Sequence, residues 1–241
     1  MKTLAAIGVL LAATPAVAAV HERTLELPQL PAVGSIHYGI SIPDDGDPKK
    51  PRPLVLALHP GGDLRPGYGA VYLAGFFLPA LRSLDAIVVA PDTPRRSWTD
   101  EVVADAVMAL LDAVIRQHVI DRSRILVTGY SMGGRGTWFM SARHAEFFTA
   151  AIPIAGAPAQ PIEVLGRIPT YAIHSTSDEV VPIGPDRDMC QELEKRGRPV
   201  RFEGVEGRGH FDTRSYGAAY GRAVQWVQER WRAKVEPAAN R

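Results

Sequence analysis

The sequence is poor in cysteine and has no excess of charge of either sign. Cys190 is the single cysteine among 241 residues, so no disulfide can form within the chain. Lys and Arg number 27 and Asp and Glu number 26, which gives a formal net charge of +1. A nucleic-acid-binding protein normally carries a basic excess or a basic stripe, so nucleic acid is not an expected partner. Balanced charge with 46% hydrophobic residues also excludes a disordered chain.

Motifs that hold metals or nucleotides are missing as well. The sequence contains no H-E-x-x-H and no cluster of Cys and His at zinc-binding spacing. Its glycine-rich segments match neither G-x-x-x-x-G-K-[ST] nor a G-x-G-x-x-G that follows a strand. We therefore expect a protein that needs no metal and no cofactor.

A long hydrophobic run occurs at the N-terminus. Lys2 precedes the apolar run 4–13, and Ala16-Val17-Ala18 has the small-x-small pattern of a cleavage site, with an alternative one residue later. The run is too short to span a bilayer comfortably, and no cysteine lies nearby to carry a lipid. We interpret residues 1–19 as a signal peptide, with an uncleaved anchor or a buried helix as the alternative. The expected location is therefore the periplasm or the extracellular space, without a stable membrane anchor.

Short apolar runs alternate with helical patterns along the rest of the chain. Continuous apolar runs, typical of strands buried on both faces, lie at 54–58, 86–90, 125–128 and 151–154. Weaker patterns predict further strands at 24–27, 35–42, 170–173 and 200–202. Helices are expected at 71–83, 100–118, 133–148, 186–196 and 216–234. This alternation predicts an α/β fold, a single domain in which a mostly parallel sheet has helices on both faces.

The strongest functional signal is the segment 129–133, Gly-Tyr-Ser-Met-Gly, which matches G-x-S-x-G. In this pattern the serine occupies a sharp turn from strand to helix, where side chains at the flanking positions would clash. Ser131 would then lie at the carboxyl ends of the parallel strands, where ligands bind, and beside the free amides of a helix N-terminus. The alternative is a glycine-rich turn without chemistry. The predicted strand 125–128 and helix 133–148 supply the context that the functional interpretation needs.

A nucleophilic serine needs a base and an acid that orients the base, and here they should follow in the order Ser, Asp or Glu, His. His210 is the histidine that follows a late predicted strand, and Asp178 follows the strand at 170–173. Glu179 is adjacent to Asp178 and is chemically capable of the same role. An exposed aspartate and a loop histidine are ordinary features when taken alone. Their order relative to Ser131, at three strand ends, favours a catalytic triad.

Three segments resemble the α/β-hydrolase superfamily: 129–138, 151–156 (Ala-Ile-Pro-Ile-Ala-Gly) and 178–182 (Asp-Glu-Val-Val-Pro). The resemblance covers about residues 50–234 and is greatest to the lid-less phospholipase/carboxylesterase and feruloyl-esterase-like branch. The catalytic domain of prolyl oligopeptidases is also similar. The resemblance implies one α/β-hydrolase domain over residues 20–241, with Ser131 as nucleophile, Asp178 as acid and His210 as base. In the family pattern D-x-V-V-P the aspartate comes first, which favours Asp178 over Glu179.

An oxyanion hole is expected beside the serine. The backbone N–H of Met132, directly after the nucleophile, is the first expected donor. The family places the second donor after the strand that corresponds to 54–58, in a His-Gly-Gly or His-Gly-x segment. Here that position is Pro60, which has no N–H to donate. Gly61 or Gly62 remains, with Gly61 preferred, and a plain tight turn is the alternative.

Other residues near strand ends have weaker interpretations. Trp98 and Tyr68 follow early strand ends and are candidates for lining a substrate pocket, with packing in the core or at the rim as the alternative. His59 and His174 each end a predicted buried strand, where hydrogen bonding behind the site is the favoured role.

The segment between two late strands bears on the substrate. Residues 157–168 leave little room for the cap that related proteins commonly insert there, so we expect no cap domain and an open site. The sequence thus predicts an exported serine esterase that cleaves small-molecule or polymer-linked carboxylic esters through an acyl-enzyme. A serine peptidase of the prolyl-oligopeptidase type and a non-catalytic binding protein on a hydrolase scaffold are the alternatives.

Overall fold

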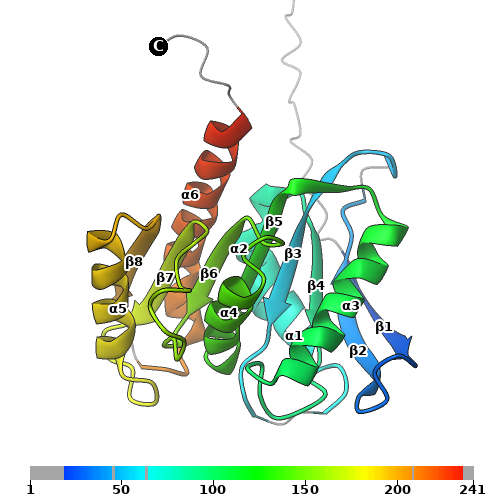
Figure 1. The fold of residues 1–241 in the computed structure, drawn as a ribbon, viewed down its shortest axis with the longest axis horizontal. Helices are drawn as coiled ribbons and strands as arrows, with labels where there is room; N and C mark the ends of the chain where they lie inside the picture. The colour runs from blue at the N-terminus through cyan, green and yellow to red at the C-terminus, as the bar shows by residue number, and fades with distance from the viewer. Residues whose placement is uncertain (1–18, 45–46, 63–64, 208, 236–241) are drawn as a thin grey trace, which may run out of the picture.

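The computed structural model describes residues 19–44, 47–62, 65–207 and 209–235. The predicted signal peptide at 1–19 lies outside these residues except for Ala19. The described chain forms an eight-stranded sheet with helices on both faces (Figure 1).

The strands follow the order β1-β2-β4-β3-β5-β6-β7-β8 across the sheet. The first two strands pair antiparallel, β2 pairs antiparallel with β4, and the pairs from β4 onward are parallel. This arrangement confirms the predicted α/β fold with a mostly parallel sheet. The strands are β1 Val20–Leu27, β2 Gly34–Ser41, β3 Arg52–Leu58, β4 Ile87–Pro91, β5 Ile120–Tyr130, β6 Ala150–Ile154, β7 Thr170–Ser175 and β8 Val200–Val205.

Four of the predicted helices are found as single α-helices. They are α3 Glu101–Gln117, α4 Met132–Arg143, α5 Ile183–Lys195 and α6 Gly217–Val235, the last preceded by the 3₁₀ turn η3 Thr213–Tyr216. Asp100 is the N-cap of α3, and its carboxylate accepts the N–H groups of Val102 and Val103. Helix α4 ends before the predicted residue 148, because the chain turns at His144 while Phe148 still packs into the core.

The helix predicted at 71–83 is divided into short pieces. They are α1 Tyr68–Tyr72, the π-helical turn η1 Leu73–Phe77, α2 Leu78–Leu81 and the 3₁₀ turn η2 Arg82–Leu84. Pro79 has no N–H for the carbonyl four residues earlier, so a regular α-helix is interrupted here. The N–H of Leu78 accordingly bonds to the carbonyl of Leu73, five residues back.

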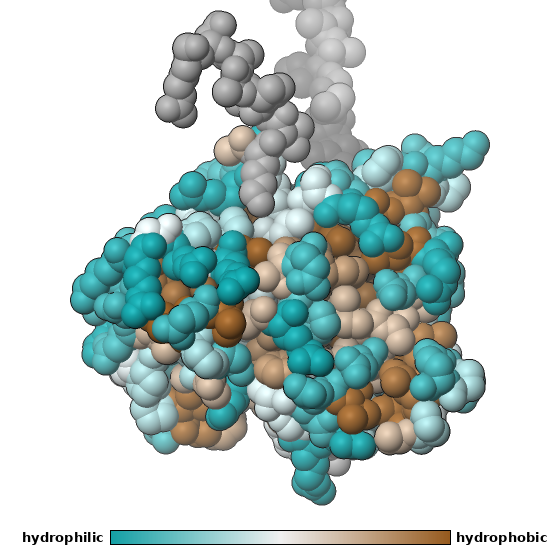
Figure 2. Space-filling model, viewed as in Figure 1, coloured by the Kyte–Doolittle hydropathy of each residue, from teal (hydrophilic) through white to brown (hydrophobic). Residues whose placement is uncertain are grey.

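Two helical layers cover the sheet. Helices α1, α2 and α6 pack on one face, and α3, α4 and α5 pack on the other (Figure 1). Hydrophilic side chains cover much of the face formed by α3, α4 and α5, with smaller apolar areas between them (Figure 2). Among the described residues, no helix combines the length and the hydrophobicity needed to cross a membrane.

The carboxyl ends of the parallel strands meet at one edge of the sheet, as expected. Between β6 and β7 the described chain forms only turns and irregular structure, so no cap is inserted there. The predicted site residues after β3, β5, β7 and β8 are thus brought to a common, uncapped edge.

Candidate active site

Ser131 occupies the sharp turn between β5 and α4. Its backbone has a φ of 57° and a ψ of −115°, a strained conformation for a residue with a side chain. Side chains at the flanking glycines would collide with the backbone: one on Gly129 would meet the carbonyl of Gly133, and one on Gly133 would meet the carbonyl of Leu58. The glycines of G-x-S-x-G therefore let the turn lie against the end of β3, and the turn presents the Ser131 hydroxyl at the strand ends.

The structure brings Ser131, His210 and Asp178 together, as the sequence predicts. His210 Nε2 lies 2.7 Å from Ser131 Oγ, and His210 Nδ1 lies 2.6 Å from Asp178 Oδ2. The side chain of Asp178 is fully buried, and that of His210 is 3% exposed. With its Nδ1–H donated to a carboxylate, the imidazole keeps the Nε2 lone pair for the serine hydroxyl, which is the arrangement of a general base.

The carboxylate of Asp178 is held in its ionised form by its neighbours. Its second oxygen, Oδ1, accepts the N–H groups of Val180 and Val181 at 2.9 and 2.7 Å. Burial alone would raise the pKa of Asp178, but the hydrogen bonds from His210 and from these two amides outweigh it and hold the pKa below its usual value. Asp178 is thus a carboxylate at neutral pH, as the orienting acid of a triad must be.

Glu179, the alternative acid, contacts the backbone of His210 rather than the imidazole. Its exposed carboxylate accepts the His210 N–H at 2.9 Å. The preceding residue, Gly209, has a φ of 104°, and a side chain there would collide with the Glu179 carboxylate. Glu179 therefore positions the loop that carries His210, and Asp178 is the carboxylate that meets the imidazole.

Tyr130 is a site residue that the sequence analysis did not identify. Its ring stacks on the His210 imidazole with 5.3 Å between centroids, and its hydroxyl donates to the His210 carbonyl oxygen. Burial raises the pKa of Tyr130, so the phenol remains a donor. Its place directly before the nucleophile was the available signal, since the turn that exposes Ser131 also directs this side chain.

The expected oxyanion donors lie beside each other. Met132 is the first residue of α4, so its N–H has no acceptor within the helix. A Cβ atom on Gly61 would lie 3.9 Å from the Met132 Cβ, which places the loop after β3 against the start of α4. The loop that carries Gly61 thus lies against the residue that follows Ser131. That the two amides share one oxyanion stays a prediction.

Three side chains hold successive carbonyls of the loop after β3. Trp98 Nε1–H donates to the His59 carbonyl at 2.9 Å, and Tyr68 donates its hydroxyl to the Gly61 carbonyl at 3.2 Å. Between them, His59 Nδ1–H donates to the carbonyl of Pro60 at 2.6 Å, while His59 Nε2 accepts the Thr93 N–H. In a trans peptide the N–H points opposite to the C=O, so fixing the Pro60 carbonyl also fixes the Gly61 N–H. His59 thus supports the loop after β3 in its neutral form, and its burial lowers its pKa.

Trp98 and Tyr68 differ in their burial. Trp98 is 1% exposed and packs in the core. It therefore does not line a pocket, and the alternative of core packing holds for this residue. Tyr68 is half-buried at the start of α1. The carboxylate of Asp92 anchors this segment by accepting the N–H groups of Gly67 and Gly69 at 2.7 and 2.6 Å. Tyr68 is consequently held over the loop after β3, where its hydroxyl meets the Gly61 carbonyl.

Two exposed apolar side chains flank the triad. Phe211 is 77% exposed, and its ring lies edge-on to the His210 imidazole with 5.3 Å between centroids. Val180, on the loop of Asp178, is 50% exposed. Exposed apolar groups beside a catalytic centre are suited to contact the substrate rather than the protein core.

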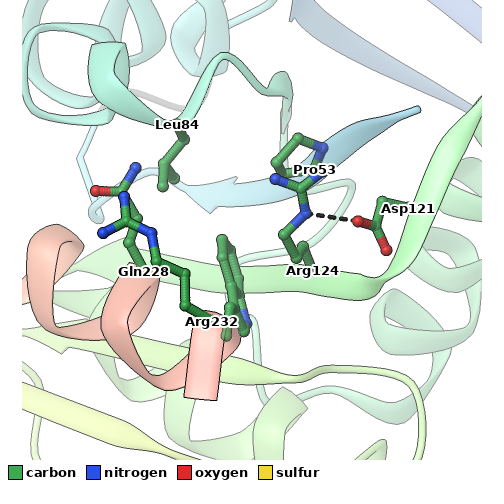
Figure 3. Close-up of a pocket in the computed structure, with 7 residues that line it drawn as sticks. Pro53, Leu84, Asp121, Arg124, Gln228 and Arg232 are labelled. Carbon is green, nitrogen blue, oxygen red and sulfur yellow. Dashed lines mark hydrogen bonds and ion pairs between the residues drawn. The ribbon is translucent and has the colours of Figure 1, made fainter. Parts of the chain in front are cut away.

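A cavity of about 470 Å³ lies elsewhere in the molecule. It is lined by Pro53 at the start of β3, by Asp121 and Arg124 in the first half of β5, and by residues of α6 that include Arg232 (Figure 3). These are the amino-terminal parts of β3 and β5, whereas Ser131 follows the carboxyl end of β5. The cavity is therefore not part of the candidate active site. Within the described ranges, no group of three or more His, Cys, Asp or Glu side chains is placed to hold a metal ion.

Comparison with known proteins adds independent information. A family model described as "Dienelactone hydrolase family" matches residues 87–235. "Feruloyl esterase C" of Emericella nidulans is 29% identical over 167 residues, which cover 61% of this chain and 56% of the relative. "Probable feruloyl esterase C" of Aspergillus niger is 27% identical over 175 residues, which cover 64% and 59%. The chain thus spans less than two thirds of the length of these curated relatives.

A solved structure shares both fold and sequence with the chain. The structure titled "Crystal Structure of a Thermostable Esterase" aligns with a TM-score of 0.70 and 28% sequence identity. The alignment covers 87% of this chain and 62% of that chain. The fold described above is therefore that of an esterase of known structure.

Proposed function

The chain belongs to the dienelactone hydrolase family, within the α/β-hydrolases, and from this membership we propose that it hydrolyses carboxylic esters with Ser131 as nucleophile. The observation that carries the proposal is the hydrogen-bonded chain of Ser131, His210 and Asp178, with contacts of 2.7 and 2.6 Å. A hydrogen-bonded serine–histidine–carboxylate chain at a strand-to-helix turn, with the serine partly accessible, fits a nucleophile and its base.

In the proposed mechanism, His210 removes the Ser131 proton while Oγ attacks the ester carbonyl. The oxyanion that develops accepts hydrogen bonds from the amides of Met132 and Gly61, which are in place before the substrate arrives. His210 then gives its proton to the departing alcohol, and the acyl group remains on Ser131. A water molecule, activated by the same imidazole, releases the acid and restores the serine. Asp178 stabilises the imidazolium that forms in both halves of the reaction.

The substrate class follows from the open edge and from the relatives. His210 protonates the leaving oxygen, so the alcohol part of the ester lies on the side of His210, where Phe211 is exposed. The lack of a cap between β6 and β7 leaves room for an alcohol that is attached to a larger molecule. Two relatives carry the name feruloyl esterase. We therefore include ferulate esters, free or polymer-linked, among the proposed substrates, together with short-chain esters.

Export is part of the proposal. It is supported by the cleavage pattern at Ala16-Val17-Ala18 and by the apolar run before it. We expect the mature protein to act in the periplasm or outside the cell. Mass spectrometry of the N-terminus after expression in a secreting host would test this, with the predicted start after Ala18 or Ala19.

The esterase proposal is tested by hydrolysis of p-nitrophenyl esters from acetate to decanoate, and of methyl ferulate, by the mature protein. Ser131→Ala should abolish turnover of every ester. Ser83→Ala, at an exposed serine in η2, is the matched control and should keep full activity. Equal rates for wild type and Ser131→Ala would refute the nucleophile. Cleavage of peptide reporters without ester hydrolysis would support the peptidase alternative instead.

A further inference from the structure

We infer that His174 and Asp186 form a second histidine–aspartate pair behind the triad, and that the Nε2–H of His174 positions Asp178 as the ionised partner of His210. This inference rests on the proposed function. It concerns residues that never touch the substrate, so His174 is a positioning residue.

The pair lies in the core, next to the same oxygen of Asp178 that meets His210. His174 is the penultimate residue of β7, and its side chain and that of Asp186 are fully buried. His174 Nδ1 lies 3.0 Å from Asp186 Oδ2. On the other side of the ring, His174 Nε2 lies 2.9 Å from the Val181 carbonyl oxygen and 3.4 Å from Asp178 Oδ2. One imidazole thus joins a buried carboxylate of α5 to the loop of the catalytic acid.

The neighbours of His174 determine its protonation. All three are oxygen atoms that accept hydrogen bonds, so both ring nitrogens are placed to donate, as only an imidazolium can. The other oxygen of Asp186 receives the Trp138 Nε1–H at 3.2 Å, so this carboxyl group meets donors on both oxygens. Burial raises the pKa of Asp186, and the hydrogen bonds from His174 and Trp138 oppose that rise and favour the carboxylate. Burial by itself disfavours the imidazolium, but the hydrogen bond and charge of Asp186, with the Val181 carbonyl and the charge of Asp178, outweigh it and raise the pKa of His174.

Within the part of the chain that the structure describes, no further cation shifts the pKa of either member of the pair. Cys190, on the same helix as Asp186, is buried, and its burial raises the pKa of the thiol, which stays neutral. Glu179, on the loop of Asp178, directs its carboxylate to the His210 N–H. The charge of the imidazolium is therefore available to the two aspartates, Asp186 and Asp178.

Asp178 needs such a partner because burial drives a carboxyl group toward its neutral form. Its Oδ2 lies between two imidazoles, 2.6 Å from His210 Nδ1 and 3.4 Å from His174 Nε2. If Asp178 were protonated or rotated, it would no longer accept the Nδ1–H of His210, and Ser131 would lose its base. The His174–Asp186 pair opposes both changes, first through its charge and second through its hold on the Val181 carbonyl.

Three variants separate the charge of the pair from its shape. His174→Leu removes every hydrogen bond, and His174→Gln keeps an N–H donor near the position of Nε2. In Asp186→Asn the amide oxygen can still accept from Trp138 and the NH₂ can donate to His174 Nδ1, so the imidazole stays in place but becomes neutral. Asp188→Asn is the matched control, because Asp188 lies on the same helix with a side chain that is 66% exposed.

We expect His174→Leu to lower kcat about 10- to 100-fold, the usual effect of losing a hydrogen bond to a buried charged group. KM should change less than about twofold, because His174 does not touch the substrate. The kcat of His174→Gln should be about tenfold higher than that of His174→Leu. In Asp186→Asn the acid limb of the kcat/KM profile should move to higher pH, because an uncompensated Asp178 is protonated more readily and attracts a proton to His210 more strongly. Asp188→Asn should match wild type.

A measurement on the unmodified protein keeps the test independent of how well the variants fold. With ¹⁵N-labelled histidine, the NMR signals of His174, assigned by their absence in His174→Gln, should show both ring nitrogens protonated at neutral pH. A neutral His174 would overturn the inference, as would a kcat within twofold of wild type in both His174→Leu and Asp186→Asn. If wild type itself hydrolyses no ester, the proposed function fails, while the NMR result still decides whether the charged pair exists.

Discussion

Replacing Asp178 with asparagine should reverse the tautomer of the catalytic histidine. In the wild type, Oδ1 of Asp178 accepts two backbone N–H groups, from Val180 and Val181. An asparagine would keep its single oxygen at the position of Oδ1, facing these two amides. Its NH₂ would take the position of Oδ2, which in the wild type lies 2.6 Å from His210 Nδ1. An NH₂ group can only donate, so His210 would carry its proton on Nε2 and could not accept the proton of Ser131.

The expected loss in kcat is about 10⁴-fold, the size observed when the acid of a serine triad is changed in this way, which corresponds to about 5.5 kcal/mol in the activation barrier. Hydrolysis of p-nitrophenyl acetate under saturating substrate measures it, and KM should stay near the wild-type value because the binding surface is unchanged. The NH₂ would also face the Nε2–H of His174, so a lower Tm is expected and should be measured in parallel.

Glu179→Gln is the control for this experiment. A glutamine oxygen can still accept the His210 N–H, so kcat should fall less than about tenfold, the usual effect of weakening one hydrogen bond. The reasoning would be refuted if Asp178→Asn kept more than a tenth of the wild-type kcat. It would also be refuted if Glu179→Gln were the inactive variant.

Three further predictions follow from the site. Tyr130→Phe keeps the ring that stacks on His210 but loses the hydroxyl donor, so it should destabilise the protein by about 1 kcal/mol in chemical denaturation and lower kcat severalfold. Phe211→Ala should lower kcat/KM about fivefold for polymer-linked ferulate while methyl ferulate and the Tm change little, because the ring is exposed and lies on the leaving-group side. His174 has a raised pKa in the folded state, so its stabilising contribution is complete below its ordinary value of 6.5 and is lost as pH rises through the raised value. The Tm difference between wild type and His174→Gln should therefore shrink as the pH rises above 6.5 and through the raised pKa.

The fold was predictable wherever a segment is apolar along its whole length. Strand β6 was predicted within one residue of its observed bounds, because it is buried from end to end. Strand β5 begins at Ile120 rather than at 125, since Ile120 pairs with Arg52 of β3 and the polar residues from Asp121 to Arg124 lie in an irregularity of the ladder before the next pair. Residue pattern alone does not mark a polar stretch as a strand, because its partner is distant in sequence.

The site was predictable where order along the chain carries information. The serine, the acid and the histidine each follow a strand of one parallel sheet, so their meeting follows from the fold. The position of Tyr130 before Ser131 marked it as a neighbour of the site, but its contacts and those of Glu179 were not predictable, because each depends on the backbone of His210 approaching a particular side chain. The interpretation of Trp98 as a pocket wall was wrong for a related reason. Its N–H finds the carbonyl of His59 in the core, a contact that no local pattern encodes.

Three buried histidines show how far the same residue type can diverge within one edge of a sheet. His59 accepts an amide N–H on Nε2 and donates from Nδ1, so it is neutral and supports the loop after β3. His210 has the same tautomer and donates from Nδ1 to a carboxylate, but its Nε2 lone pair meets the Ser131 hydroxyl and can take the serine proton. His174 meets only acceptors, so in the proposed charged pair both of its nitrogens already carry protons and it cannot take another. The neighbours of each ring, rather than its position after a strand, therefore decide which histidine can act as the base, and only His210 combines a free lone pair with contact to the nucleophile.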